Sequence, residues 1–262
     1  MSGTLRDALG RTVPLDPEPR RILALVPSVT RCLFDLGVGA RVVGRTDYCA
    51  APREEVQTLP RVGGPKTVSV ERVLALAPDL VLADAEENQR DPIAELERRG
   101  LRVYVALPRT LERVAGFLRD LAALVRRPQA RQWADELTRA SASAPGPPVP
   151  VACLVWNSPY MAAAPDTLPH AVLTAAGGSN VVARQGDRRY PEIAAAALAR
   201  ARPRVILLPD DPYPFSATDA AELEASVPGA TAVCIPGEWV SWYGSRMVES
   251  LQGLTRSLDP FR

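Results

Sequence analysis

The stretch SVERVLALAPDLVLAD, residues 69–84, decides the fold, because a related stretch returns later in the chain. The second copy is YPEIAAAALARARPRVILLPD, residues 190–210. In each copy a short helix is expected first, and Pro78 or Pro203 ends it because proline cannot continue the helical hydrogen-bond ladder. An apolar run follows directly and predicts a buried strand. Two such copies predict two similar α/β lobes with a ligand cleft between them.

Strands and helices alternate around the first copy. A small hairpin or an edge strand is expected over residues 4–13, turned at Gly10, and a loop over residues 47–60. Apolar runs predict strands at 21–26, 42–44 and 101–107, and 3–4 spacing predicts helices from residue 30, over 92–99 and over 110–126. This alternation is typical of a parallel sheet covered by helices on both faces.

The pattern restarts after a proline-rich stretch, SASAPGPPVP, at residues 141–150. We therefore expect an N-terminal α/β lobe over residues 1–127, a helix over 128–143 and a C-terminal α/β lobe over 148–262. In the C-terminal lobe the expected strands are 151–156, 181–182 and 231–235, and the expected helices are 169–176, 218–226 and 244–257, besides the second copy.

Composition excludes several classes of partner. The chain has 262 residues, and its 31 basic and 30 acidic side chains give a net charge of +1, so nothing marks a nucleic-acid or anionic-lipid surface. No window approaches the roughly 20 apolar residues of a membrane span. Residues 1–19 are polar and contain no apolar signal-peptide region. This predicts a cytoplasmic protein, the alternative being an extracytoplasmic protein whose signal peptide was removed.

Metal and catalytic motifs are sparse. The four cysteines (Cys32, Cys49, Cys153 and Cys234) form no C-x-x-C pair, and their helix and strand contexts favour reduced thiols, buried at Cys32, Cys153 and Cys234. The single histidine, His170, is expected to pack or to cap a helix. No nucleophile elbow, phosphate loop or dinucleotide fingerprint is present. We therefore expect no metal site, no covalent cofactor and no enzymatic activity.

Aromatic side chains gather where strands end. Most of the four tryptophans and six tyrosines fall in segments that follow an expected strand, and such segments line the ligand crevice of open parallel sheets. Their faces suit a broad, flat or hydrophobic ligand. The alternative for any single ring is that it fills a gap under a helix. The segment EWVSWYGSR, residues 238–246, favours the ligand role most, because it joins three large rings to a carboxylate and an arginine.

Several motifs resemble the class III periplasmic binding proteins, also called helical-backbone metal receptors. They are VPSVT (26–30), LGVG (36–39), VGRTDY (43–48), VGG (62–64) and GGSNV (177–181), together with the first helix–proline–strand copy. A signal-less branch of this family is similar at DYC (47–49), GGPK (63–66), EEN (86–88), RYP (189–191), DPYPF (211–215) and SWYGSR (241–246). The family binds cobalamin, haem or ferric siderophores and delivers them to ABC importers. The resemblance implies two Rossmann-like lobes joined by a backbone helix, here residues 128–143.

The leading hypothesis is non-enzymatic binding of a corrinoid, a metal chelate or a siderophore-like ligand in the inter-lobe cleft. Ligand contacts are expected from the N-terminal lobe at Tyr48, Lys66, Glu86, Glu87 and Asn88. From the C-terminal lobe they are expected at Trp156, Tyr160, Tyr190, Tyr213, Phe215, Glu238, Trp239, Trp242 and Tyr243. Arg45, Arg189 and Arg246 are candidates for pairing with carboxylate or phosphate groups of the ligand, which a guanidinium fork suits, or for structural ion pairs.

The resemblance also implies a partner. Transport-competent members present one glutamate per lobe to an ABC permease, and Glu71 matches the first. The same count back from Pro203 reaches Ala196, so the second docking carboxylate is missing, and Glu192 matches a different position. Docking to a permease is therefore in doubt, and we expect a monomer.

Two further hypotheses stay open. A chelatase-like enzyme that handles metal can share a bilobal shape, and it would need Glu86, Glu87, Glu238 and His170 to converge. A cytoplasmic sensing or interaction module could keep the fold and fill its cleft with its own tryptophan and tyrosine side chains.

Overall fold

The computed structural model describes residues 3–142, 146–183 and 185–262. The chain divides into two compact units. The first comprises the residues up to Pro108 together with Arg113–Ala134, and the second comprises Arg109–Glu112 and the residues from Asp135 onward. The helix expected over 128–143 is α6 (Gln129–Ala140), and the boundary between the units falls inside it. Residues 143–145 of the expected linker lie outside the described part of the chain, as does Arg184 of the expected C-terminal lobe.

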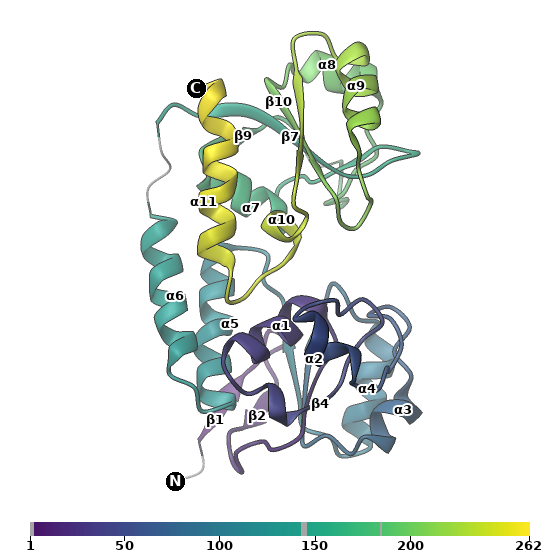
Figure 1. Ribbon diagram of the computed structural model, residues 1–262, viewed down its shortest axis with the longest axis vertical. Helices are drawn as coiled ribbons and strands as arrows, with labels where there is room; N and C mark the ends of the chain where they lie inside the picture. The colour runs from purple at the N-terminus through teal and green to yellow at the C-terminus, as the bar shows by residue number, and fades with distance from the viewer. Residues whose placement is uncertain (1–2, 143–145, 184) are drawn as a thin grey trace. The chain divides into compact units, whose positions relative to one another are not determined.

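A parallel four-stranded sheet forms the centre of the first unit (Figure 1). Its strands are β4 (Val42–Gly44), β3 (Ile22–Ala24), β5 (Leu80–Asp84) and β6 (Val103–Ala106), in that spatial order. All five residues of β5 are buried, as expected of a parallel strand covered on both faces. The strand order changes direction between β3 and β5, and in open α/β sheets ligands bind at this kind of switch point.

Besides the first half of α6, six helical segments of the described chain belong wholly or mainly to the first unit. They are α1 (Pro27–Asp35), η1 (Gly39–Arg41), α2 (Arg53–Gln57), α3 (Val70–Ala75), α4 (Arg90–Arg98) and α5 (Leu111–Leu124). The short helix α2 lies in the expected loop 47–60, where five residues are too few to show an apolar repeat. The expected hairpin is present as β1 (Thr4–Arg6) and β2 (Thr12–Pro14), and Gly10 turns it with a φ of +77°.

The second unit has its own parallel sheet, in the order β11 (Thr231–Ile235), β10 (Val205–Pro209) and β7 (Val149–Trp156), and β7 also pairs with β9 (Gly178–Asn180). An antiparallel strand, β8 (Met161–Ala162), extends it. The prediction of a strand at 181–182 is wrong by three residues, because the observed strand β9 begins at Gly178. Gly178 explains the position, because a Cβ there would lie 2.8 Å from the carbonyl oxygen of Leu173, so only glycine lets β9 approach this closely.

The helical segments of the described chain that lie wholly in the second unit are α7 (Leu168–Ala175), α8 (Ala195–Ala201), α9 (Ala217–Ser226), α10 (Glu238–Ser241), α11 (Met247–Leu258) and the final turn η2 (Asp259–Phe261). Four of these helices, α7, α8, α9 and α11, lie close to the expected positions, whereas α10 and the final turn η2 were not predicted. No disulfide joins any of the four cysteines, and Cys32, Cys49 and Cys153 are buried. The expected burial of Cys234 is wrong, because β11 is the edge strand of its sheet and leaves this thiol exposed.

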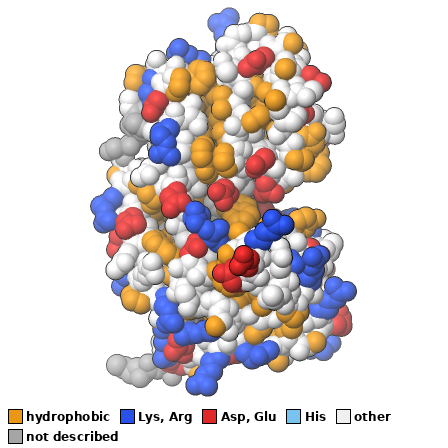
Figure 2. Space-filling model, in the orientation of Figure 1, with side chains coloured by type: hydrophobic (Ala, Val, Ile, Leu, Met, Phe, Trp, Pro, Cys, Tyr) orange, Lys and Arg blue, Asp and Glu red, His pale blue; other side chains and the backbone are white. Residues whose placement is uncertain are grey.

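Charged side chains of both signs are interspersed on the face shown in Figure 2, in keeping with the net charge of +1. In the described part of the chain, no helix is both long and apolar enough to cross a membrane.

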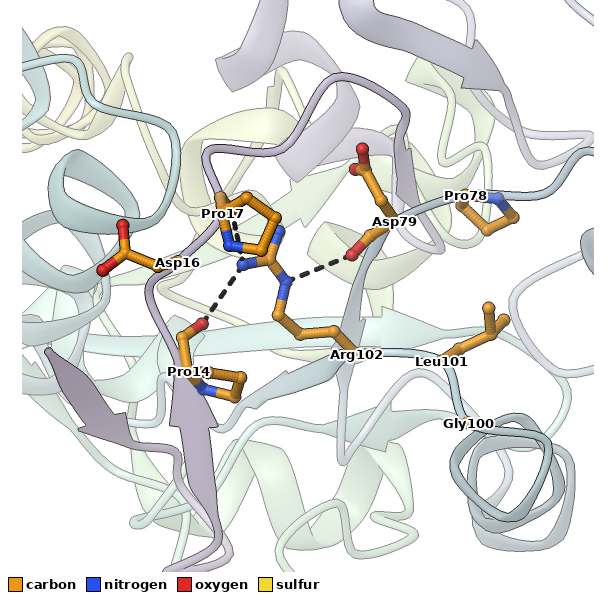
Figure 3. A pocket seen from close by; sticks show the side chains of 8 residues that line it. All are labelled: Pro14, Asp16, Pro17, Pro78, Asp79, Gly100, Leu101 and Arg102. Carbon is orange, nitrogen blue, oxygen red and sulfur yellow. Dashed lines mark hydrogen bonds between the residues drawn. The ribbon is translucent and has the colours of Figure 1, made fainter. Parts of the chain in front are cut away.

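A pocket of about 300 Å³ lies at the amino-terminal edge of the first sheet, walled by three prolines and Leu101 (Figure 3). At its base Arg102 donates hydrogen bonds to the carbonyl oxygens of Asp79 (3.1 Å), Pro14 (3.2 Å) and Pro17 (2.9 Å). Burial lowers the pKa of Arg102, and the charges of Asp79 and Asp16 oppose this shift. Arg102 thus fastens the segment after β2 to the beginnings of β5 and β6, at the edge opposite the carboxyl ends of the strands.

His170 links α7 to β9 in one defined protonation state. The side chain of Asn180 donates through Nδ2 to the carbonyl oxygen of Ala163 (2.9 Å) and accepts through Oδ1 from the amide of Val182 (3.0 Å). These bonds fix the amide, so Nδ2 also faces Nδ1 of His170, 3.0 Å away. Nδ1 must therefore accept a hydrogen bond, which requires a neutral ring. Burial also lowers the pKa of His170.

We expect His170 to make the second unit less stable in mild acid. As the pH falls below about 6.5, the imidazole of the unfolded chain takes up a proton while the folded one stays neutral, so the free energy of unfolding decreases. The loss has a limit of about 1.4 kcal/mol per pH unit for one proton. Urea unfolding at pH 7.5 and 5.5 measures it, with His170→Gln as control. An equal pH dependence in both proteins would contradict the assignment, because the chain has one histidine.

Candidate functional site

In the first unit, the loop after β5 is organised by Asp84, the last residue of that strand. Its buried carboxylate accepts hydrogen bonds from the backbone amides of Glu86 (2.7 Å) and Glu87 (3.0 Å). This satisfies two backbone donors that the end of the strand would leave without partners. The two predicted glutamates are thereby fixed in the turn that follows a central strand, at the carboxyl edge of the sheet.

Asn88 joins three segments at the same edge. Its Nδ2 donates to the carbonyl oxygens of Leu25 (3.1 Å), which follows β3, and Pro65 (3.0 Å), and its Oδ1 accepts from the amide of Asp84 (2.9 Å). Asn88 is only 7% exposed. Lys66 reinforces the junction, because its ammonium group donates to the carbonyl oxygen of Glu86. The structure thus brings these predicted residues together, with Asn88 placed as an internal support.

Tyr48 is the exposed aromatic residue of this edge. It lies in the turn that follows β4 and is 70% exposed, more than any other large hydrophobic side chain in the described part of the chain. Its ring lies against Gly64, where an added Cβ would be 3.1 Å from the ring atom Cε2. A large ring held on the backbone in this way offers its outer face to a ligand.

Trp156 is the corresponding exposed ring of the second unit. It is the last residue of β7 and is 43% exposed. Its ring meets Tyr213 edge to face at a centroid distance of 5.7 Å, and Tyr213 meets the buried Phe215 at 4.7 Å. Phe215 belongs to the core, and Tyr160 packs against the same core cluster. Trp156 is therefore the outer end of an aromatic row that is rooted in the core of its unit.

The polar groups beside this row are ordered by α9. Asn157 donates to a carboxylate oxygen of Asp219 (2.9 Å), and Ser216 and Asp219 form the capping box at the start of α9. The hydrogen bond from Ser216 lowers the pKa of Asp219. Burial raises the pKa of Tyr160, assisted by the nearby acidic side chains. Tyr190 is half-buried in the segment before α8.

The segment 238–246 makes mainly internal contacts. The ring of Trp239 lies on Gly253 of α11, where a Cβ would be 2.6 Å from Cζ2. Trp242 hydrogen-bonds to the carboxylate of Asp211, Tyr243 is buried, and Glu238 is half-buried at the start of α10. Arg246 forms an ion pair with Glu249 of α11 (3.0 Å). A ligand role for this segment remains a prediction.

Two acidic residues were not predicted for the site although they follow β10 directly. Asp210 accepts a hydrogen bond from the amide of Gly237 (2.6 Å), which ties the end of β10 to the start of α10. Burial raises the pKa of Asp211, opposed by its hydrogen bond from Trp242. The signal available in the sequence was a strand ending in two successive aspartates.

The three candidate anion-binding arginines have different surroundings. Arg45 is buried, at 5% exposure, and its contacts are with backbone carbonyl groups. Arg189 is half-buried and donates to the carbonyl oxygen of Asp166 (3.5 Å). Arg246 is the exposed member of the set.

Metal-ligating side chains do not gather in the described part of the chain, where no group of three or more His, Cys, Asp or Glu residues could hold a metal ion. His170 is committed to Asn180 through Nδ1.

The two copies of the helix–proline–strand unit differ at their helix starts. Glu71 is the second residue of α3 and is exposed, and its carboxylate accepts from the hydroxyl of Ser69 (3.3 Å). Ala196 is the second residue of α8, so the equivalent position carries no charge. Glu192 lies three residues before α8 begins.

Comparison with known proteins identifies the fold. The family model described as "Periplasmic binding protein" matches residues 22–232. The vitamin B12-binding protein of Pectobacterium atrosepticum is 24% identical over 255 residues, which cover 92% of this chain and 88% of that protein. That of Yersinia pestis is 28% identical over 196 residues, 72% of this chain and 69% of that protein.

Solved structures agree in fold. The periplasmic vitamin B12 binding protein BtuF of Vibrio cholerae superposes with a TM-score of 0.79 at 21% identity, covering 93% of this chain and 98% of that one. The periplasmic heme-binding protein RhuT from Roseiflexus sp. RS-1 gives 0.77 at 23% identity, covering 93% and 99%. The predicted class of fold is confirmed, with two α/β lobes built on parallel sheets. The chain belongs to the class III periplasmic binding protein family.

Proposed function

We propose that this chain is a non-enzymatic binding protein for a broad, flat ligand of the corrinoid or metal-chelate class. Tyr48 and Trp156 supply the main faces, and the neighbouring polar groups Lys66, Glu86 and Asn157 fix the ligand's orientation.

One observation carries the proposal. In the described part of the chain the large hydrophobic side chains left exposed are Leu9, Tyr48 and Trp156. Tyr48 lies in the turn after β4 of one unit, and Trp156 is the last residue of β7 in the other. Full burial of a large apolar side chain stabilises a fold by about 1.5–3 kcal/mol relative to full exposure. Two rings that stay exposed at ligand-binding edges therefore favour a partner that covers them.

The relatives support the ligand class. Proteins similar to this chain over most of its length are vitamin B12-binding proteins, and the solved structures that share its fold include heme-binding proteins. Corrins and porphyrins are both broad, flat tetrapyrrole rings, so the proposal names this shared chemistry. Tyr213 and Phe215 support the ring of Trp156. A ligand role remains a prediction for the other predicted residues, which are Tyr160, Tyr190, Glu87, Asn88, Glu238, Trp239, Trp242, Tyr243 and Arg246.

We expect cyanocobalamin or haemin to bind with one-to-one stoichiometry and to quench tryptophan fluorescence, because both absorb near-ultraviolet light and would lie against Trp156. A titration of the purified protein, repeated by isothermal calorimetry, measures the dissociation constant. Ferric siderophore analogues are titrated in the same way as a third class of ligand. Absence of heat and quenching with all three ligand classes would contradict the proposal and favour the sensing module.

Removing either exposed ring should weaken binding. Tyr48→Ala and Trp156→Ala are each expected to raise the dissociation constant roughly 5- to 30-fold, a loss of about 1–2 kcal/mol, since aromatic contacts dominate such sites. Neither should reduce stability by more than about 1 kcal/mol, because exposed rings contribute little to the core.

Leu9→Ala is the matched control for those variants. Leu9 is 54% exposed in the turn between β1 and β2 and belongs to neither strand-end loop. It should bind the ligand as the unmodified chain does. Equal weakening by all three variants would show a nonspecific surface effect and would contradict the assignment of Tyr48 and Trp156.

We propose that any docking to an ABC permease depends on the first unit. Glu71 is exposed at the start of α3, whereas α8 carries Ala196 at the equivalent position. One carboxylate in place of two halves the charge pairing available to such a partner, which supports ligand holding as the main role.

The cytoplasmic location remains a prediction. Its support is the presence of four cysteines with no disulfide among them, which is usual in a reducing compartment. Solved relatives are described as periplasmic proteins, so fractionation of the native host distinguishes the two compartments.

A further inference from the structure

We propose that Arg45 and Cys49 are positioning residues that hold the turn Thr46–Cys49 in one conformation and so preorganise Tyr48 for its ligand. This inference rests on the proposed function. It assigns a role to a buried guanidinium group that the ligand contacts do not require.

Arg45 fastens both ends of the turn. Its Nη1 donates to the carbonyl oxygens of Thr46 (3.2 Å) and Cys49 (3.3 Å). The turn itself is closed by a hydrogen bond from the amide of Cys49 to the carbonyl oxygen of Thr46 (3.3 Å). One guanidinium nitrogen of Arg45 therefore bonds the carbonyl groups on both sides of Asp47 and Tyr48.

The burial of Arg45 is costly and calls for a function. The side chain is 5% exposed, and its Nε is buried without a hydrogen-bond partner. In the described part of the chain, the hydrogen bonds of its guanidinium group go to the backbone carbonyl oxygens of Thr46 and Cys49. A buried cation without a charged partner destabilises a fold, and a buried polar atom without a hydrogen-bond partner calls for an explanation.

Cys49 and its neighbours fix the turn from inside the unit. The thiol of Cys49 donates to the hydroxyl of Thr30 on α1 (3.2 Å) and lies 3.1 Å from the hydroxyl of Thr46. All three side chains are buried. The thiol–hydroxyl contacts join the turn after β4 to the first turns of the helix that follows β3.

The loop that contains Gly63 and Gly64 also contacts the turn. The amide of Asp47 donates to the carbonyl oxygen of Gly63 (3.0 Å), and the ring of Tyr48 rests on Gly64. Gly63 has a φ of +101°, and a Cβ there would lie 2.3 Å from the carbonyl oxygen of Thr67, so glycine is required. Arg45, Cys49 and the loop at Gly63 and Gly64 thus restrain the turn, while the ring of Tyr48 remains exposed.

Such restraint acts on affinity through entropy. Ordering a ring on binding weakens affinity about two- to tenfold, and a ring that is already ordered avoids this loss. Arg45 would therefore strengthen binding without touching the ligand.

Hydrogen exchange of the ligand-free protein tests the restraint directly. In Arg45→Met we expect the amides of Asp47 and Cys49 to exchange at least about tenfold faster, while the amide of Val81 in β5 keeps its rate. The urea midpoint should stay the same or rise, because a buried unpaired charge has been removed. Thr30→Val should give the same local change with the charge retained. Unchanged exchange at Asp47 and Cys49 in both variants, or a general loss of protection, would overturn the inference.

A double-mutant cycle separates this inference from the proposed function. With cyanocobalamin and haemin as probes, Arg45→Met should weaken binding about two- to tenfold in the natural chain and less than about twofold in the Tyr48→Ala background. A full effect in that background would show that Arg45 acts on the ligand directly and would overturn the positioning role. If Tyr48→Ala leaves binding unchanged, the assigned ligand face fails, and the exchange result alone decides whether Arg45 holds the turn.

Discussion

The fold depends on one requirement: where a buried parallel strand ends, its backbone amide and carbonyl groups must find new partners. Asp84 and Asn88 supply them after β5, and Arg45 supplies them after β4. These polar side chains stay inside the protein because their partners are there. The loops that they fix consequently have defined shapes, and this is what allows those loops to present rings to a ligand.

The two units meet this requirement differently and reach a similar result. In the first unit, buried polar groups hold a short turn, and a single ring stands on glycine backbone. In the second unit, the exposed ring continues an aromatic row into the core. Both arrangements leave one large face exposed after a strand. Rigid faces suit a rigid planar ligand, since little conformational freedom remains to be lost on either side.

Sequence periodicity predicted most elements because buried strands and amphipathic helices repeat with characteristic spacing. β11 was placed at its observed ends, whereas β9 was displaced because close approach at Gly178, rather than apolar character, selects its position. The site was harder to predict. Residue type suggested Tyr48 and Trp156, but it could not distinguish Trp239, which lies on Gly253, from an exposed ring. Nor could it show that the side-chain amide of Asn88 hydrogen-bonds three backbone groups, because those groups lie far from one another in the chain.

The central claim is that this chain binds a corrinoid or metal chelate without transforming it. Native mass spectrometry of the protein purified from its own host, combined with a visible absorption spectrum, tests it most directly. The account predicts one bound, unmodified molecule per chain with tetrapyrrole or iron-chelate absorption. A ligand-free mass from the native host, with a colourless protein, would contradict it.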